Sequence, residues 1–228
     1  MSEKPAAPRG VDPAVADAIA AAHAIYTPFM LGLYDHLVHG ISNRFAWGCP
    51  TERLLDLYRR HLTPRHLEAG VGTGFFIDGA NPASFDRLVL LDINRHCLAR
   101  SARRLARYEP LLREANLLSP LILEGEPADS IGLTYVLHCL PGRMAEKLCV
   151  IENLRPSMRE GTVLFGATIL GRGIEPNAAA RALLGLYNAK GVFNNLEDDL
   201  AALTTGLKAR FGRVDIETRG CVALFRAS

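Results

Sequence analysis

The residues best suited to bind a ligand lie in one short stretch, HLEAGVGTGFF, which combines a carboxylate with three alternating glycines. Gly70, Gly72 and Gly74 follow directly on an apolar segment that contains Glu68. Glycine adopts positive φ without steric cost and lets a ligand approach the bare backbone, and a helix N-terminus behind such a turn attracts negative charge. The spacing therefore predicts a strand, a ligand-binding turn and a helix, in that order.

A second carboxylate follows at a distance suited to nucleoside recognition. Asp92 ends the apolar run LVLLD and lies 18 residues beyond Gly74 (92 minus 74). In dinucleotide-binding folds, an acidic residue at the end of the second strand accepts hydrogen bonds from the ribose hydroxyls. The glycine turn and Asp92 together predict a nucleoside-binding site.

Two nucleosides, NAD and S-adenosylmethionine, are compatible with these residues. The NAD fingerprint is G-x-G-x-x-G, whereas the third glycine here comes one residue early. Glu68 opens the motif, and its charge would repel a pyrophosphate but attract the ammonium group of an amino acid. A chain of 228 residues also leaves no room for the substrate domain of a dehydrogenase. These observations favour S-adenosylmethionine.

The elements that must position this site alternate between strands and helices from His66 onward, which predicts a parallel sheet. We expect strands at residues 65–69, 87–91, 111–115, 129–134 and 162–169. We expect the helices between them at residues 74–79, 95–108 and 143–154. The strands expected at 211–217 and 221–226 are joined by three residues, and a parallel crossover needs a dozen or more. The last two strands must therefore form an antiparallel hairpin.

Helices are expected before the first strand and after the fifth. Pro and cap signals predict helices at residues 12–27 and 28–38 and a third after Pro50, behind a mobile arm of ten residues. After the fifth strand, residues 170–194 form an expected lid with a helix in its middle, and Asn195 is expected to cap the next helix. The predicted organisation is a single domain, with an arm and helical cap at residues 1–62 and a core at 63–228 that carries the lid.

The pattern Glu68-x-Gly70-x-Gly72-x-Gly74, Asp92 and the closing hairpin resemble the class I S-adenosylmethionine-dependent methyltransferases, whose seventh strand is antiparallel. The resemblance covers residues 64–228. It implies a Rossmann-like α/β fold, a mostly parallel seven-stranded sheet, S-adenosylmethionine as cofactor and S-adenosylhomocysteine as product. The segment YTPFMLGLYDHLVHGISNRFAWGCPT further resembles methyltransferases of bacterial and fungal natural-product pathways.

The resemblance also implies which residues contact each part of the cofactor. The methionyl part would lie along Glu68, Gly70 with its neighbouring glycines, and Tyr135 at the end of the fourth strand. Asp92 would hold the ribose and Ile93 would pack on the adenine. Asn116 and Leu117, after the third strand, would stand beside the adenine amino group, although Asp is common in the family at the first of these positions.

Methyl transfer is an in-line displacement at a sulfonium, so the protein must chiefly align the acceptor and exclude water. A general base is needed only when the acceptor is protonated. His138 follows the fourth strand and is the expected base or positioning residue. Tyr26, Tyr34 and Trp47 of the cap are expected to contact the substrate, with packing against the sheet as the alternative for each.

Composition excludes several classes of protein. The chain has 26 basic and 24 acidic residues, and it lacks the (D/N)-P-P-(Y/F) motif of enzymes that methylate exocyclic base amines, so no nucleic-acid partner is expected. The five cysteines form no C-x-x-C pair, which argues against structural zinc or disulfides and for a reducing cytoplasm. No metal site, secretory signal or membrane span is expected.

We therefore predict methyl transfer from S-adenosylmethionine to a small-molecule acceptor, a secondary metabolite by the resemblance. An RNA or protein methyltransferase of the same fold is one alternative. A regulator that binds S-adenosylmethionine without catalysis is another. The sequence leaves open the identity of the acceptor, the atom that is methylated and the oligomeric state.

Overall fold

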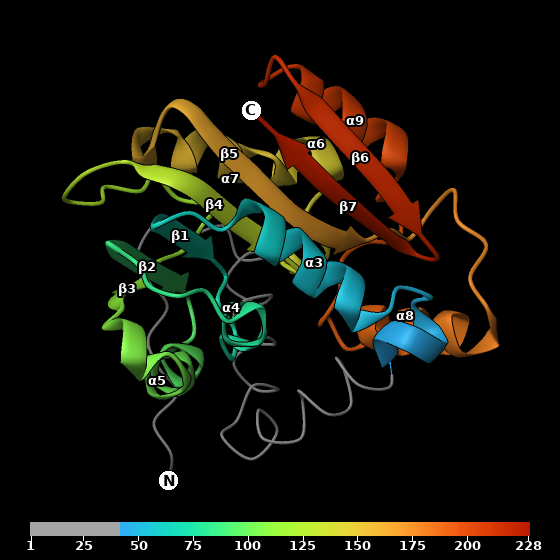
Figure 1. Cartoon of the computed structure of the whole chain (residues 1–228). Helices are drawn as coiled ribbons and strands as arrows, with labels where there is room; N and C mark the ends of the chain where they lie inside the picture. Colours follow the sequence, from blue (N-terminus) through green and yellow to red (C-terminus); the bar gives the residue numbers. More distant parts are fainter. Residues whose placement is uncertain (1–41) are drawn as a thin grey trace, which may run out of the picture.

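The computed structural model describes residues 42–228, in which helices cover both faces of one seven-stranded sheet (Figure 1). The expected arm and the helices predicted at residues 12–27 and 28–38 lie outside the described residues, as do Tyr26 and Tyr34. Residues 42–46 form a single π-helical turn ahead of the first helix that follows Pro50.

The sheet has the mixed topology that the sequence predicts. Its strands are β1 (Arg65–Ala69), β2 (Arg87–Asp92), β3 (Leu111–Glu114), β4 (Ala128–Thr134), β5 (Met158–Ile169), β6 (Val214–Arg219) and β7 (Val222–Ala227). Their order is β3-β2-β1-β4-β5-β7-β6. Strands β1 to β5 are parallel, and β7 runs antiparallel to both of its neighbours. The predicted seven-stranded sheet with a closing hairpin is confirmed. The order reverses between β1 and β4, and open α/β sheets bind ligands at the carboxyl ends of strands at such a point.

The helices form two layers. They are α3 (Thr51–His61), α4 (Phe75–Ala80), α5 (Arg95–Arg104), α6 (Met144–Lys147), α7 (Cys149–Leu154), α8 (Ala178–Ala189) and α9 (Leu200–Lys208). Apolar side chains of α3, α4, α5 and α8 join one core, and those of α6, α7 and α9 join the core on the other face of the sheet. The helix predicted at 95–108 ends at Arg104 and continues as a 3₁₀ turn, and the one predicted at 143–154 is divided at Leu148.

The prediction that Asn195 caps the last helix is wrong. Helix α9 begins five residues later, at Leu200, and the Asp199 carboxylate accepts the cap hydrogen bond from Ala202 N–H at 2.7 Å. The Asn195 side chain is fully buried and instead donates to the Ile169 carbonyl and accepts from Asn188. Asn195 therefore ties the end of β5 to the segment after α8, because its amide can both donate and accept.

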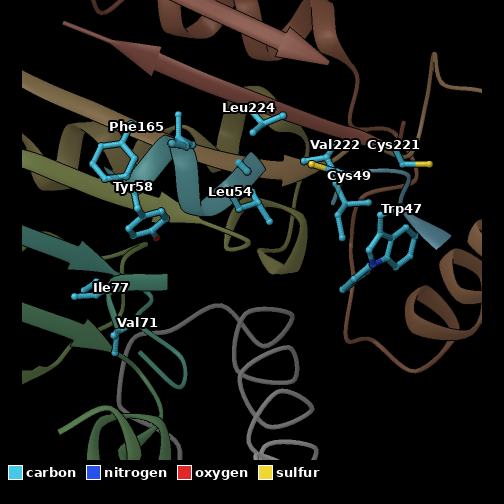
Figure 2. Packing of buried hydrophobic residues seen from close by; sticks show 14 of the residues in the cluster. Trp47, Cys49, Leu54, Tyr58, Val71, Ile77, Phe165, Cys221, Val222 and Leu224 are labelled. Atoms are coloured by element: carbon cyan, nitrogen blue, oxygen red, sulfur yellow. The ribbon is translucent and has the colours of Figure 1, made fainter. Parts of the chain in front are cut away.

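The segment before α3 packs onto the closing hairpin through apolar side chains and one backbone hydrogen bond. Figure 2 shows Cys49 of this segment beside Val222 of β7, while Tyr58 of α3 lies beside Phe165 of β5. Cys221 N–H donates to the Trp47 carbonyl at 2.8 Å. Residues far apart in the sequence thus share one core. The hydrogen bond between Cys221 and Trp47 fixes the position at which α3 begins to pack on the sheet.

Gly220 makes this approach possible. Its φ is +55°, in the left-handed region, and a Cβ at this position would overlap the Trp47 carbonyl oxygen. Gly48 faces it in turn, and a Cβ at Gly48 would lie 3.1 Å from Gly220 Cα. A side chain at residue 220 would thus combine backbone strain with a collision against backbone, which moves less readily than a flexible side chain.

We predict that Gly220→Ala lowers the free energy of unfolding by about 3 kcal/mol, the sum of left-handed strain and an overpacked contact. Gly161→Ala is the matched control for strain alone, because Gly161 has φ +82° and open space around a Cβ, and it should cost about 1–2 kcal/mol. Gly212 has neither a positive φ nor a neighbour close to a Cβ, so Gly212→Ala should change the free energy of unfolding by no more than about 0.5 kcal/mol. Denaturant unfolding of the three variants measures these differences. Equal losses for Gly220→Ala and Gly161→Ala would contradict the collision.

Candidate cofactor and acceptor site

The turn after β1 places three successive glycines at positive φ, at +76° for Gly70, +54° for Gly72 and +74° for Gly74. A Cβ at Gly70 would strike the Val136 side chain, and one at Gly74 would press on Leu105 and Ser101. Among residues 42–228, a Cβ at Gly72 would meet no atom within 4 Å. The outer glycines therefore serve close packing, while Gly72 borders open space where a ligand can meet the backbone.

Asp92 connects this turn to the end of β2. One carboxylate oxygen accepts from Gly72 N–H at 2.9 Å, and the other accepts from Asn94 N–H at 2.8 Å. Hydrogen bonds from backbone to a charged acceptor are strong and directional, so they orient the carboxylate beside the open side of the turn. Ile93 follows and is half-buried. The structure thus brings Gly72, Asp92 and Ile93 together, as the sequence predicted for a nucleoside.

The residues predicted beside the adenine have clear structural contacts. The Asn116 side-chain oxygen accepts from Leu118 N–H at 3.0 Å, which closes the turn after β3. The Leu117 side chain is buried in the core on the α6–α7 face, and its carbonyl accepts from Asn153. Both residues hold the turn that ends at the same edge of the sheet as Asp92. Their contact with an adenine stays a prediction.

Glu68 is buried, with 4% of its surface exposed, and both of its oxygens are hydrogen-bonded. Tyr58 of α3 donates to one oxygen at 2.5 Å, and the other lies 2.9 Å from His66 Nε2. Sequence reasoning missed Tyr58 and His66 as partners. The period of two in a strand was the available signal for His66, because residues 66 and 68 of β1 must share a face. No local signal linked Tyr58 to β1.

Tyr135 has an unusual backbone at the end of β4. Its φ is +61°, which is uncommon for an aromatic residue and costs energy unless the surroundings impose it. Its N–H donates to the Ala167 carbonyl at 2.7 Å, and its hydroxyl donates to Asn43 Oδ1 at 2.9 Å. These bonds hold the ring against Phe76 and His138. Strained backbone of this kind clusters at ligand-binding sites, which supports the predicted role of Tyr135.

His138 is buried, and the structure settles which ring nitrogen accepts. Ile169 N–H donates to His138 Nδ1 at 3.3 Å, so the proton of the neutral ring sits on Nε2. Burial, with a smaller effect of the Lys147 charge, lowers the pKa of His138 to about 3. The expectation that His138 acts as a general base does not fit this geometry, because its lone pair is already engaged and its affinity for a proton is low. A hydrogen-bond donor at Nε2 is compatible with it.

Trp47 is buried in the core of the described part of the chain. Its ring is 1% exposed and packs 5.9 Å from the Phe193 ring, centroid to centroid, within the core (Figure 2). This is the packing that the sequence offered as the alternative for Trp47, since an indole presents a large apolar surface to a neighbouring aromatic ring. A contact between Trp47 and a substrate stays a prediction. Phe193 in turn lies 4.4 Å from the His138 ring.

The predicted lid is held firmly at its C-terminal end. Lys147 of α6 is fully buried and forms an ion pair with Asp198 at 2.6 Å, and its ammonium also donates to the Asn194 carbonyl. Burial lowers the pKa of Lys147 and raises that of Asp198, while their mutual attraction opposes both shifts. Breaking such a pair leaves an uncompensated buried charge, so it fixes this segment beside His138.

Residues 42–228 contain neither a candidate metal site nor a candidate membrane-spanning helix. No group of three or more His, Cys, Asp or Glu side chains in this range is arranged to hold a metal ion. None of the helices described here is long and apolar enough to cross a membrane.

Comparisons with known proteins agree with this geometry. No model of a known protein family matches the chain. The chain is 37% identical over 203 residues to demethylluteothin O-methyltransferase of Streptomyces thioluteus, covering 89% of this chain and 88% of the relative. It is 34% identical over 206 residues to the physcion biosynthesis cluster O-methyltransferase of Aspergillus chevalieri, covering 90% of this chain and 93% of the relative. The fold resembles the solved DhpI–SAH complex, with a TM-score of 0.66, 14% identity and coverage of 92% and 96%.

The protonation of His138 makes the stability depend on pH in a defined direction. The unfolded chain binds a proton on this histidine below about pH 6.5, whereas the folded protein stays neutral there until about pH 3. The stabilisation from a neutral His138 is therefore complete above pH 6.5 and is lost as the pH falls from about 6.5 towards 3. We predict that the free energy of unfolding falls more steeply over this range in the wild type than in His138→Asn, whose amide oxygen can still accept from Ile169.

Urea unfolding at several pH values measures the two slopes. His96→Asn removes an exposed histidine and should keep the wild-type slope. Parallel slopes for the wild type and His138→Asn would mean that His138 is not held neutral by the fold.

Proposed function

This chain belongs to the class I S-adenosylmethionine-dependent methyltransferases, and we propose that it methylates a hydroxyl oxygen of a small-molecule acceptor. Both relatives described above carry O-methyltransferase in their names. The sequence is related to them over about nine-tenths of its length, a stretch long enough to contain the glycine turn and Asp92. A small acceptor fits this relationship better than a nucleic acid or a protein does.

The observation that carries this function is the open backbone at Gly72 beside an oriented carboxylate. A Cβ at Gly72 would come within 4 Å of none of the described residues, and Gly72 N–H is bonded to Asp92. An open glycine backbone beside an oriented carboxylate fits a nucleoside. In this proposal Asp92 holds the ribose hydroxyls and Ile93 packs against the adenine. Glu68 and Tyr135 border the methionyl end. S-Adenosylmethionine bound there supplies a methyl group already activated on a sulfonium.

The chain's own residues then align the acceptor. His138 carries its proton on Nε2 and donates it in a hydrogen bond to the acceptor oxygen, and the aromatic rings of Tyr135 and Phe193 pack against the His138 ring. A neutral donor stabilises an oxyanion without taking its proton. Because His138 is not a base, we infer that the acceptor hydroxyl is acidic, as in a phenol or an enol, and loses its proton without help from His138.

We extend the same proposal to the organisation of the chain. The helical cap before residue 63 and the segment at about 170–194 close over the carboxyl ends of the strands as parts of a single domain. Support comes from the hydrogen bond between Tyr135, which follows β4, and Asn43 of the cap, and from the hydrogen bond that buried Lys147 donates to the Asn194 carbonyl. The five free cysteines support a reducing, cytoplasmic setting.

We predict that the purified protein transfers the methyl group of S-adenosylmethionine to phenolic or enolic hydroxyls. Acceptors matched in size but carrying an aliphatic alcohol or an amine should react at least about a hundredfold more slowly, because His138 can stabilise an oxyanion but cannot deprotonate. Mass spectrometry of products from a mixed acceptor panel gives the comparison. Methylation confined to amines would contradict the proposed oxygen acceptor.

We predict that Asp92→Asn weakens binding of S-adenosylhomocysteine by about 10- to 100-fold, because the amide loses the charge and half of the acceptor capacity that the ribose hydroxyls need. Asp86→Asn is the matched control, since Asp86 is exposed just before the opposite end of the same strand. Isothermal titration calorimetry measures both affinities. An unchanged affinity in folded Asp92→Asn would remove Asp92 from the site.

A further inference from the structure

The Glu68 carboxylate is buried without a Lys or Arg partner among the described residues, so its charge must be balanced in another way. Burying an isolated carboxylate is very costly, and proteins avoid it by pairing or by protonation. The nearest side chain that can carry a positive charge is His66, whose ring lies 2.9 Å from Glu68 and is itself buried. The protonation of these two side chains therefore has to be considered together.

Four consecutive contacts lead away from Glu68, and each needs one proton. The first joins Glu68 to His66 Nε2 at 2.9 Å, and the second joins His66 Nδ1 to Ser130 Oγ at 2.8 Å. The third joins Ser130 Oγ to Thr63 Oγ1 at 2.8 Å, and in the fourth the Thr63 hydroxyl donates to the Arg65 carbonyl at 3.0 Å. The Thr63 N–H donates separately to Ser130 Oγ at 3.2 Å.

The four contacts need four protons, one for each hydrogen bond. The two hydroxyls supply two protons, and a neutral histidine beside a carboxylate supplies one more, which leaves one contact without a proton. All four contacts are satisfied only when the pair of Glu68 and His66 holds an additional proton. An imidazolium beside a carboxylate meets this condition, and so does a neutral His66 protonated at Nδ1 beside a carboxylic acid. In both forms Nδ1 carries a proton and the pair has no net charge.

The surroundings favour the form with a charged ring. His66 stacks between Phe165 and Phe85, with ring centroids 5.8 Å and 6.2 Å away, and aromatic faces attract cations. Tyr58 donates to Glu68, and burial together with the Glu68 charge raises the pKa of Tyr58, so this hydroxyl keeps its proton.

Other charged groups near the pair are compensated or remote. Arg65, on the same strand, forms ion pairs with Asp129 of β4 and with Glu126. His61 of α3 lies against Phe165, and burial lowers its pKa. Arg87, at the start of β2, donates to the Glu124 and Glu126 carbonyls. None of these side chains bonds to Glu68 or His66, so the additional proton belongs to that pair.

We propose that His66 is a positioning residue that stores this proton with Glu68 and releases it when the ammonium group of the cofactor binds at Glu68. An arriving ammonium would give the buried pair a net positive charge, which release of one proton to the solvent removes. The charge count balances, because one cation enters and one proton leaves. This step rests on the proposed function, since it requires the methionyl end of the cofactor to lie beside Glu68.

Calorimetry of S-adenosylhomocysteine binding in buffers with different ionisation enthalpies measures the proton directly. We expect about one proton released per ligand at neutral pH, and an affinity that falls by up to about tenfold per pH unit as the pH is lowered. Glu68→Gln should abolish the release, because the amide satisfies the same contacts without a titratable proton. His61→Gln, the matched histidine control, should keep it.

These measurements distinguish failure of the proposed function from failure of the proposed role of His66. No binding of S-adenosylhomocysteine to the folded wild type would overturn the proposed function, whereas binding without proton release would overturn only the role of His66. Nitrogen-15 spectra of the histidine rings give a second measurement that needs no variant. We expect a proton on His66 Nδ1 in the free protein, and a ring protonated at Nε2 alone would contradict the stored proton.

Discussion

The site depends on one constraint, the passage of the backbone through three left-handed positions between β1 and α4. Close packing against Val136, Leu105 and Ser101 crowds a side chain at the outer two positions, where φ is also positive. The Asp92 carboxylate then holds the middle one by its N–H. The open face of the turn is thereby fixed at the edge where β1, β2 and β4 end. Everything that we assign to the cofactor is placed relative to this turn.

Polar groups buried around the turn have their charges balanced inside the protein. Glu68 takes its hydrogen bonds from Tyr58 and His66, and the Lys147 ammonium is matched by Asp198. Two of these contacts join different elements, Tyr58 of α3 to Glu68 of β1 and Lys147 of α6 to Asp198, because the cost of an unpaired buried charge is met by a partner that the fold brings close. These contacts serve two purposes at once. They hold α3 and the segment after α8 in place, and they set which protons the site can exchange.

His138 illustrates how such surroundings change the chemistry of a residue. A histidine in solution is a base near neutral pH, but here Ile169 occupies its lone pair and burial keeps the ring neutral. The same residue then suits donation to an oxygen that has already lost its proton. The nature of the acceptor is thus tied to the burial of one ring, and the rings of Tyr135 and Phe193 provide that burial.

The sequence by itself determined the strands, the closing hairpin, the glycine turn and Asp92, because local patterns of apolar residues, glycines and connection lengths encode them. Strand β1 was predicted at the bounds that the structure has, and the three-residue connection before Cys221 required an antiparallel pair. Only the tertiary structure decided that Asp199 caps α9, that Trp47 belongs to the core and that Tyr58 of α3 donates to Glu68. Side-chain hydrogen bonds between distant elements have no period or spacing in the chain, so they become visible only when the elements are assembled.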